Sequence, residues 1–291
     1  MPKPFSSLFF SRKKAPQPLQ PVAFKEYYTN WFTTLNNTLL PLINQSLYSS
    51  SSPPALLCSH IDLLLQHLLS YYDTLDLVAT QEHLPQLLFP SWRNSLEIPF
   101  LFLGDLHPYL FTNLLRSFLD QEDSEEEEDD SDEEEEDDDD FLDRPWQVEM
   151  AWKNVPKSLM TRVEQIECGL RLMVPALTDR IKKVQGCFVG RIAGDWVGFC
   201  CEGKRETVKV KAVIEEAMKE EMEEMVTVFV DANRLRKSVI TEIVGVLTHY
   251  QAALFLQGLA QFLVGFRDPD LIAEFKRTNN FSITGGFHLA F

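Results

Sequence analysis

Hydrophobic side chains recur at steps of three and four residues along much of this chain, which is the spacing of one face of an α-helix. The first stripe runs from Val22 to about Leu47. The second begins after Pro53-Pro54, a pair that suits the first turn of a helix, and ends near Leu75. The spacing therefore predicts two long amphipathic helices, each with one buried face.

Prolines interrupt the pattern that follows. Pro85, Pro90 and Pro99 predict short helices or turns, because proline lacks the amide hydrogen that a helix interior needs. The stretch 104–108 contains both glycine and proline and predicts a further turn. Residues 109–119 return to the helical spacing and predict another helix.

The second half of the chain opens with a long amphipathic helix predicted over 156–185. Pro175 lies inside this helix and is expected to kink it. Five glycines then punctuate residues 186–203, which we interpret as a loop. Residues 206–225 follow as a strongly charged helix whose acidic and basic side chains suit a solvated face.

The clearest stripe of the chain runs from Val228 to Ala253 in steps of four and three residues. From Leu254 to Phe266 the sequence is apolar almost all round, so this segment is expected at the centre of the fold. Asp268-Pro269 supplies a cap and a first-turn proline for a short terminal helix. The tail that contains Gly285-Gly286 is expected to fray.

These elements predict an all-α fold, a multi-helix bundle with long amphipathic helices and a disordered acidic insert. The two halves are expected to share one core. Two separate domains stay open, because the acidic tether could extend to roughly 60 Å at about 3.3 Å per residue. The expected organisation is a disordered basic arm at 1–21, helical halves at 22–120 and 144–267, an acidic linker at 121–143, and a short helix and tail at 268–291.

The charge of the chain is concentrated in one tract. Of the 19 residues from Glu122 to Asp140, 17 are acidic, and without them the formal net charge would rise from −17 to 0. Such a segment buries no apolar surface and is expected to be disordered. Ser124 and Ser131 lie inside it and are candidate sites for an acid-directed kinase. A purely solubilising spacer is the alternative interpretation.

The N-terminal arm combines aromatic and basic residues without any acidic one. Such a combination favours contact with an anionic membrane surface, and the arm can instead lie against the acidic tract or do nothing specific. The start of the chain lacks the apolar region of a signal peptide, which favours the cytosol. The candidate membrane-contact residues are Phe5, Phe9, Phe10, Arg12, Lys13 and Lys14.

Candidate chemistry is sparse. His60 and His67 lie on the flank of the second stripe, and without a third ligand beside them we interpret them as solvent-edge or packing residues. Asp105 and His107 are two residues apart, which does not place them face to face on a helix. Asp105 is expected instead to cap the helix that starts near Pro108. No catalytic residue, metal ligand or cofactor is predicted, and an enzyme is disfavoured.

Several spaced signatures resemble the plant delay-of-germination domain, which also forms the C-terminal part of TGA-type bZIP transcription factors. Their order across about residues 22–266 makes the resemblance specific. In the first half they are Phe24 with Trp31, Tyr71-Tyr72, Trp92 with Ser95 and Glu97, and Gly104-Asp105 with Pro108. In the second half they are Ala232-Asn233-Arg234-Leu235-Arg236 and Leu247-Thr248-His249-Tyr250-Gln251-Ala252-Ala253.

Within that family, a short arm, an acidic insert and no bZIP region are similar to the inaperturate-pollen group. The resemblance implies a non-enzymatic factor that marks plasma-membrane regions where the pollen wall stays thin and apertures form. It also implies a cytoplasmic protein peripherally associated with those regions, with a nuclear pool as a further location.

The leading hypothesis is therefore an interaction scaffold. Arg234 and Lys237 lie on the polar side of the 228–253 stripe and are candidates for contact with a protein partner. Direct DNA binding is not expected, because no basic region with leucine heptads precedes Phe24, and no small-molecule substrate is expected. The alternatives are a transcriptional co-regulator and a haem- or ligand-responsive signalling adaptor, in which His249 approaches a buried ligand.

Overall fold

A computed structural model describes residues 21–49, 53–120, 146–200 and 207–284 of this chain. The predictions for the membrane-contact residues of the arm, for the acidic tract with Ser124 and Ser131, and for the Gly285-Gly286 tail lie outside the described residues.

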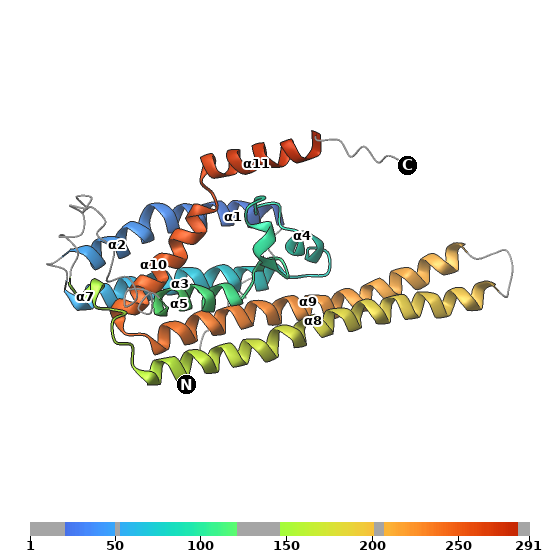
Figure 1. The fold of residues 1–291 in the computed structure, drawn as a ribbon. Coiled ribbons are helices and arrows are strands. Elements are labelled where there is room, and N and C mark those ends of the chain that lie inside the picture. The colour runs from blue at the N-terminus through green and yellow to red at the C-terminus, as the bar shows by residue number, and fades with distance from the viewer. Residues whose placement is uncertain (1–20, 50–52, 121–145, 201–206, 285–291) are drawn as a thin grey trace, which may run out of the picture.

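The first stripe forms one unbroken helical run. It comprises α1 (Pro21–Thr34), a π-helical turn over Leu35–Leu39 and α2 (Leu40–Tyr48), and it is followed by α3 (Pro54–Val78) (Figure 1). These helices confirm the two predicted from the spacing, including the start of the second at Pro54. Their buried side chains follow the predicted stripes, among them Phe24, Tyr28, Trp31 and Leu35 on the first and Ile61, Leu64, Leu68 and Leu75 on the second.

The proline-rich region forms short elements, as predicted. It contains α4 (Leu84–Leu88), a 3₁₀ turn (Ile98–Phe100) and a two-stranded antiparallel hairpin of β1 (Leu101–Phe102) and β2 (Asp105–Leu106). The turn between the strands requires glycine at its second position. Gly104 has φ +80°, and a Cβ there would lie 2.1 Å from the carbonyl oxygen of Leu87. The tight turn thus seats the hairpin against the end of α4.

The predicted helix at Tyr109–Leu119 is confirmed as α5, and the next described helix is the short α7 (Trp146–Glu149). The chain then enters α8 (Lys157–Cys200) and α9 (Thr207–Val246), which lie side by side and extend beyond the rest of the bundle (Figure 1). The charged segment and most of the 228–253 stripe are therefore one helix.

The loop predicted from the glycines after Gln185 is wrong, because α8 continues through Pro175 and through Gly186, Gly190 and Gly194. Glycine in a helix interior costs about 0.5–1 kcal/mol relative to alanine, so glycine alone weakens a helix without ending it. Pairing with α9 offsets that cost. Where α8 and α9 extend beyond the bundle, Val184 and Ala217 are buried between them, and Arg191 of α8 pairs with Glu220 of α9 at 2.8 Å.

The stripe predicted to continue to Ala253 is also interrupted. Thr248 ends it by forming a capping box: its side chain accepts a hydrogen bond from the amide of Gln251, and the Gln251 side chain accepts one from the amide of Thr248. A new helix, α10 (His249–Gly265), begins there. The terminal helix α11 (Pro269–Thr284) has the predicted cap, because Asp268 Oδ1 accepts hydrogen bonds from the amides of Asp270 and Leu271, both at 2.9 Å.

Helix α10 lies at the centre of the fold, as predicted for residues 254–266. It packs against α2, α3, α5 and α7, and buries Phe255, Leu256, Leu259 and Leu263. Buried residues from both sides of the acidic tract join one hydrophobic cluster around it. The all-α class is confirmed, and the hairpin is the one sheet among the described residues. Within those residues, none of the helices has the length and apolar character needed to span a membrane.

Candidate functional site

The signature residues of the first half converge on a buried ionic cluster, which we define as Tyr71, Arg93, Glu97, Asp105 and Arg236. Arg93 donates to Glu97 Oε1 at 2.7 Å and to Asp105 Oδ2 at 2.8 Å. The hydroxyl of Tyr71 donates a short hydrogen bond to the same carboxylate oxygen of Asp105. All five side chains are almost completely buried, so bulk solvent does little to screen their charges.

Asp105 is ionised in the folded protein. Burial alone would raise the pKa of its carboxyl, but the nearby Arg93 and Arg236 and the hydrogen bond from Tyr71 outweigh burial and lower it. The second carboxylate oxygen accepts from the backbone amide of Leu106 at 2.8 Å. Removing one member of such a cluster leaves an unpaired buried charge.

Arg236 attaches α9 to the hairpin. Its guanidinium donates to the backbone carbonyl oxygens of Leu106 at 2.7 Å, of Asp105 at 3.2 Å and of Phe102. It also donates to Asn233 Oδ1 at 2.8 Å, one turn earlier on α9. These contacts give the Ala232–Arg236 signature a structural role, because they fix the position of α9 on the bundle.

Lys237 makes its described contacts within the chain. Its ammonium pairs with Asp73 at 2.7 Å and with Asp76 at 2.8 Å, and Asn233 donates to Asp76 at 2.8 Å. Lys237 therefore joins α9 to α3, while its side chain keeps 24% of its exposure. The prediction that it contacts a partner stays a prediction.

The predicted packing role of His67 agrees with its surroundings. Its ring lies parallel to that of Trp31, with 5.1 Å between centroids. The Nε2 of His67 donates to the carbonyl oxygen of Trp31, and the Nε1 of Trp31 donates to that of His67, both at 2.9 Å. His60 contacts the hydroxyl of Ser46 on α2. Among the described residues, no group of three histidine, cysteine or acidic side chains is placed to hold a metal ion.

The capping role predicted for Asp105 is wrong, because Oδ2 accepts from Tyr71 and Arg93, Oδ1 accepts from the amide of Leu106, and α5 has no side-chain cap. The amide at the start of α5, that of Tyr109, donates instead to His107 Nδ1 at 3.2 Å. His249, the residue named for a haem ligand, is exposed in the first turn of α10. Its position does not supply a buried axial ligand.

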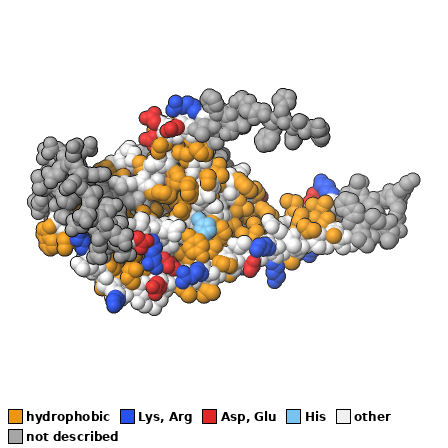
Figure 2. Space-filling view, viewed as in Figure 1, with side chains coloured by type: hydrophobic (Ala, Val, Ile, Leu, Met, Phe, Trp, Pro, Cys, Tyr) orange, Lys and Arg blue, Asp and Glu red, His pale blue; other side chains and the backbone are white. Residues whose placement is uncertain are grey.

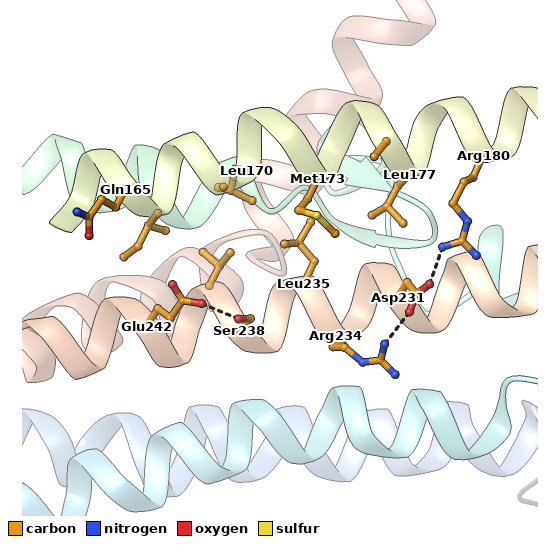
Figure 3. Close-up of a pocket in the computed structure, with 14 residues that line it drawn as sticks. Gln165, Leu170, Met173, Leu177, Arg180, Asp231, Arg234, Leu235, Ser238 and Glu242 are labelled. Carbon is orange, nitrogen blue, oxygen red and sulfur yellow. Dashed lines mark hydrogen bonds and ion pairs between the residues drawn. The ribbon is translucent and has the colours of Figure 1, made fainter. Parts of the chain in front are cut away.

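A groove runs along the surface between α8 and α9, with a volume of about 420 Å³. We define the α8–α9 groove by the side chains that Figure 3 labels. Leu170, Met173 and Leu177 from α8 and Leu235 from α9 point toward one another and form its floor (Figure 3). Met173 is 47% exposed, although Leu170 and Leu177 are buried. The floor is therefore apolar and reachable from solvent.

Charged side chains form the rim of the groove. Asp231 accepts from Arg180 at 2.6 Å on one side and from Arg234 at 2.9 Å on the other. At the other end, Ser238 donates to Glu242 at 2.7 Å. The Arg234 side chain keeps 73% of its exposure, so its remaining donors face solvent. This arrangement can bind a polar or acidic group next to an apolar surface.

The wall of the groove on α8 contains small residues. Gly169 has no atom within 4 Å of the place where a Cβ would lie, and Ala176 lines the same wall. Both are exposed, which allows a second backbone to approach closely. A long, straight groove of this shape between two helices fits a third helix better than a compact small molecule.

Sequence reasoning found only part of this geometry. It singled out Arg234, and Asp105 and Glu97 appeared within the signatures, but it did not single out Arg93. The spacing of Arg93 and Glu97, four residues apart with opposite charges, was the signal that could have found the pair. The hydrophobic spacing did not indicate the groove, because Gly169 and Met173 fit the helical pattern of α8 and nothing in that pattern marks them as exposed.

The class of protein follows from the first of two comparisons. The family model described as "DOG1: Seed dormancy control" matches residues 30–117. That range holds Trp31, Arg93 and Asp105, which the structure brings together. The delay-of-germination resemblance is thus confirmed.

The second comparison covers nearly the whole chain. The chain is 51% identical over 278 residues to Protein INAPERTURATE POLLEN1 of Arabidopsis thaliana, covering 94% of this chain and 97% of that protein. It is 29% identical over 283 residues to the Protein INAPERTURATE POLLEN 1 homolog of Oryza sativa subsp. japonica, covering 95% and 97%. The chain belongs to the INAPERTURATE POLLEN1 family.

Proposed function

We propose that this protein is a non-enzymatic factor in the formation of pollen apertures and acts there as an interaction scaffold. The observation that carries the proposal is the 51% identity to the Arabidopsis relative across 94% of this chain. A similarity of this extent includes the helices of the bundle and the projecting α8–α9 pair alike. The relative's name connects it with pollen apertures, and we extend that role to this chain.

The α8–α9 groove supports the scaffold role. Its exposed apolar floor and small-residue wall suit an amphipathic helix, which would bury its apolar face against Met173 and Leu235. A carboxylate on that helix would lie opposite Arg234, whose guanidinium is largely exposed. We therefore propose a partner that presents an amphipathic helix with an acidic residue on its edge.

The charge arrangement of the bundle supports a role without catalysis. Asp105 and Glu97 are the most deeply buried carboxylates described, and Arg93 binds both of them. A general acid or base needs access to a substrate and a pKa close to the working pH. The lowered pKa of Asp105 and its burial serve stability instead.

A location at plasma-membrane domains completes the proposal, with the basic and aromatic arm as the membrane contact. Aromatic side chains and basic charges add their contributions at an anionic surface. Flotation of the full chain with anionic vesicles is expected, and a chain that begins at Val22 is expected to remain unbound. Equal binding by the two proteins would refute membrane contact through the arm.

Complementation tests the role in pollen. Expression of this chain in Arabidopsis plants that lack their own INAPERTURATE POLLEN1 is expected to restore apertures, scored by microscopy of mature pollen. Pollen without apertures, despite normal accumulation of the protein, would overturn the proposal.

The same assay tests the groove through a matched pair of charge reversals. Arg234→Glu is expected to abolish or strongly reduce restoration, because it repels the proposed acidic partner. Lys182→Glu is the control, since Lys182 is 71% exposed on α8 and does not line the groove. Equal restoration by both variants would exclude Arg234 from partner contact.

A further inference from the structure

A second groove lies where α10 meets α11, with a volume of about 720 Å³. We call it the aromatic groove and define it by its lining residues. Figure 2 shows hydrophobic side chains gathered on this face, next to the start of α11. The lining residues are Leu96, Pro99, Phe100, Phe262, Gly265, Phe266, Leu271, Glu274 and Phe275.

The walls of the aromatic groove hold one another in place. The ring centroids of Phe262 and Phe266 are 4.5 Å apart, and that of Phe100 lies 5.3 Å from Phe266 and 6.4 Å from Phe262. Yet Phe100 is 40% exposed and Leu271 is 52% exposed. A fixed aromatic surface of this size in contact with water is typical of a binding site.

The described chain begins beside this groove. Phe24, in the first turn of α1, lies 4.8 Å from Trp92 between ring centroids. Arg267, directly after the groove residue Phe266, donates to the carbonyl oxygen of Trp92, and its guanidinium lies 4.7 Å from the centre of the Tyr28 ring. These contacts fix the start of α1 close to the groove wall.

The chain before α1 has the chemistry that the aromatic groove would bind. Residues 1–20 include Phe5, Leu8, Phe9 and Phe10, with basic residues on both sides of them and no acidic one. Residues 11–20 can span up to roughly 33 Å at about 3.3 Å per residue. This length suffices for the arm to reach the aromatic groove from the start of α1. Glu274 is the one charged residue among the described lining residues, and its sign is opposite to that of the arm.

We propose that the aromatic groove binds this protein's own N-terminal arm, with the side chains of Phe5, Phe9 and Phe10 against Phe100, Phe262 and Phe266. Aromatic rings would then be buried on rings, and the basic residues would approach Glu274. The docking does not depend on the proposed function. If the arm also binds membranes, the same phenylalanines serve both contacts, so binding of the arm to the groove prevents its binding to a membrane.

Photo-cross-linking in the full chain tests this docking. A benzophenone amino acid in place of Phe9 keeps an aromatic side chain there, and mass spectrometry after irradiation identifies the residues that it reaches. Intramolecular cross-links to residues 96–100 or 262–275 are expected. Cross-links between two copies would replace the proposal with a dimer contact, and cross-links elsewhere, or none, would overturn it.

Two substitutions outside the bundle's core control the experiment. Leu271→Lys in the groove is expected to reduce the cross-link yield about tenfold, because a charge there opposes burial of the aromatic side chains and its sign repels the basic arm. Leu77→Lys is the matched control, since Leu77 is 74% exposed on α3 and does not line the groove, and it is expected to leave the yield unchanged. An equal effect of the two would contradict the proposal. Aperture complementation tests the proposed function separately, so the docking of the arm and the proposed function can each be refuted without the other.

Discussion

The ionic cluster inside the bundle and the α8–α9 groove on its surface use the same residue types in opposite ways. In the cluster, Arg93 and Asp105 are buried, and their partners are other side chains and, for Asp105, the backbone amide of Leu106. In the groove, Arg234 and Asp231 form a similar pair at an exposed rim above an apolar floor. A buried pair fixes a fold, whereas an exposed pair next to apolar surface is available for recognition.

The match to the family model follows the same division. Its range, residues 30–117, includes the hairpin and Arg93 but ends before α8. The groove, by contrast, consists entirely of residues from α8 and α9. The matched range thus holds four of the five cluster residues, whereas Arg236 and the whole groove belong to the helices that follow it.

The largest expected effect comes from the cluster. Asp105→Asn is expected to lower the free energy of unfolding by about 3–5 kcal/mol, because it leaves Arg93 and Arg236 without their shared buried anion. Urea unfolding followed by circular dichroism measures the change. Asp179→Asn is the control, since Asp179 is 73% exposed in its pair with Lys182. A loss below about 1 kcal/mol for Asp105→Asn would show that the cluster is not a main support of the fold.

A smaller loss of stability is expected when the ion pairs between α9 and α3 are removed. Lys237→Ala is expected to cost about 1 kcal/mol, because it removes two ion pairs that join α9 to α3 at a partly exposed position. The matched control, Lys211→Ala, removes a pair with Glu215 in which Lys211 is 77% exposed, and it should change stability by less than about 0.5 kcal/mol. Equal urea midpoints for the two variants would refute the joining role of Lys237.

Substitutions in the α8–α9 groove are expected to impair function while leaving stability unchanged. Met173→Glu is expected to change the free energy of unfolding by less than about 0.5 kcal/mol, since Met173 is 47% exposed. It is nevertheless expected to prevent aperture restoration, because a carboxylate on the floor opposes an apolar partner face. Met218→Glu, at a methionine that is 49% exposed outside the groove, should restore apertures normally.

The smallest effect concerns mild acid. Burial lowers the pKa of both His67 and His107, so the folded state opposes their protonation. Stability is therefore complete above the ordinary histidine pKa of about 6.5 and decreases as the pH falls below it. The lowered pKa of Asp105 adds its own loss of stability only as the pH falls through the ordinary Asp pKa of about 3.9 and below. We expect a fall in Tm of roughly a few degrees between pH 7.5 and 5.5, and a smaller fall in His67→Gln.

Helical spacing predicted most of the fold because it reports directly on burial. It located α3, α5 and the central segment of α10, while the family resemblance singled out Trp31 and Trp92, which are buried. It failed at Gly186–Gly194, where pairing of α8 with α9 outweighs a weak local preference. It also failed at Thr248, where a capping box ends one helix and begins another without a change in apolar spacing.

The ionic cluster and the two grooves could be predicted only in part, because they depend on contacts between distant segments. Arg93 and Arg236 meet at the hairpin although long stretches of chain separate them, and neither lies in a hydrophobic stripe that marks it as buried. The assignment of Asp105 as a cap used local spacing alone. Its carboxylate is held inward by Arg93 and by Tyr71 of α3, which are distant from it in the sequence.

The central position of α10 has a consequence for the way this protein is made. The helix begins at His249, so the ribosome completes nearly the whole chain before the core can close. At roughly 5–20 residues per second, α3 and α5 wait on the order of ten seconds or more with the apolar faces that α10 covers still exposed. During that interval the nascent chain is a natural client for chaperones, and a premature stop before α10 would leave Leu68 and Phe111 without the cover of Leu259 and Leu263.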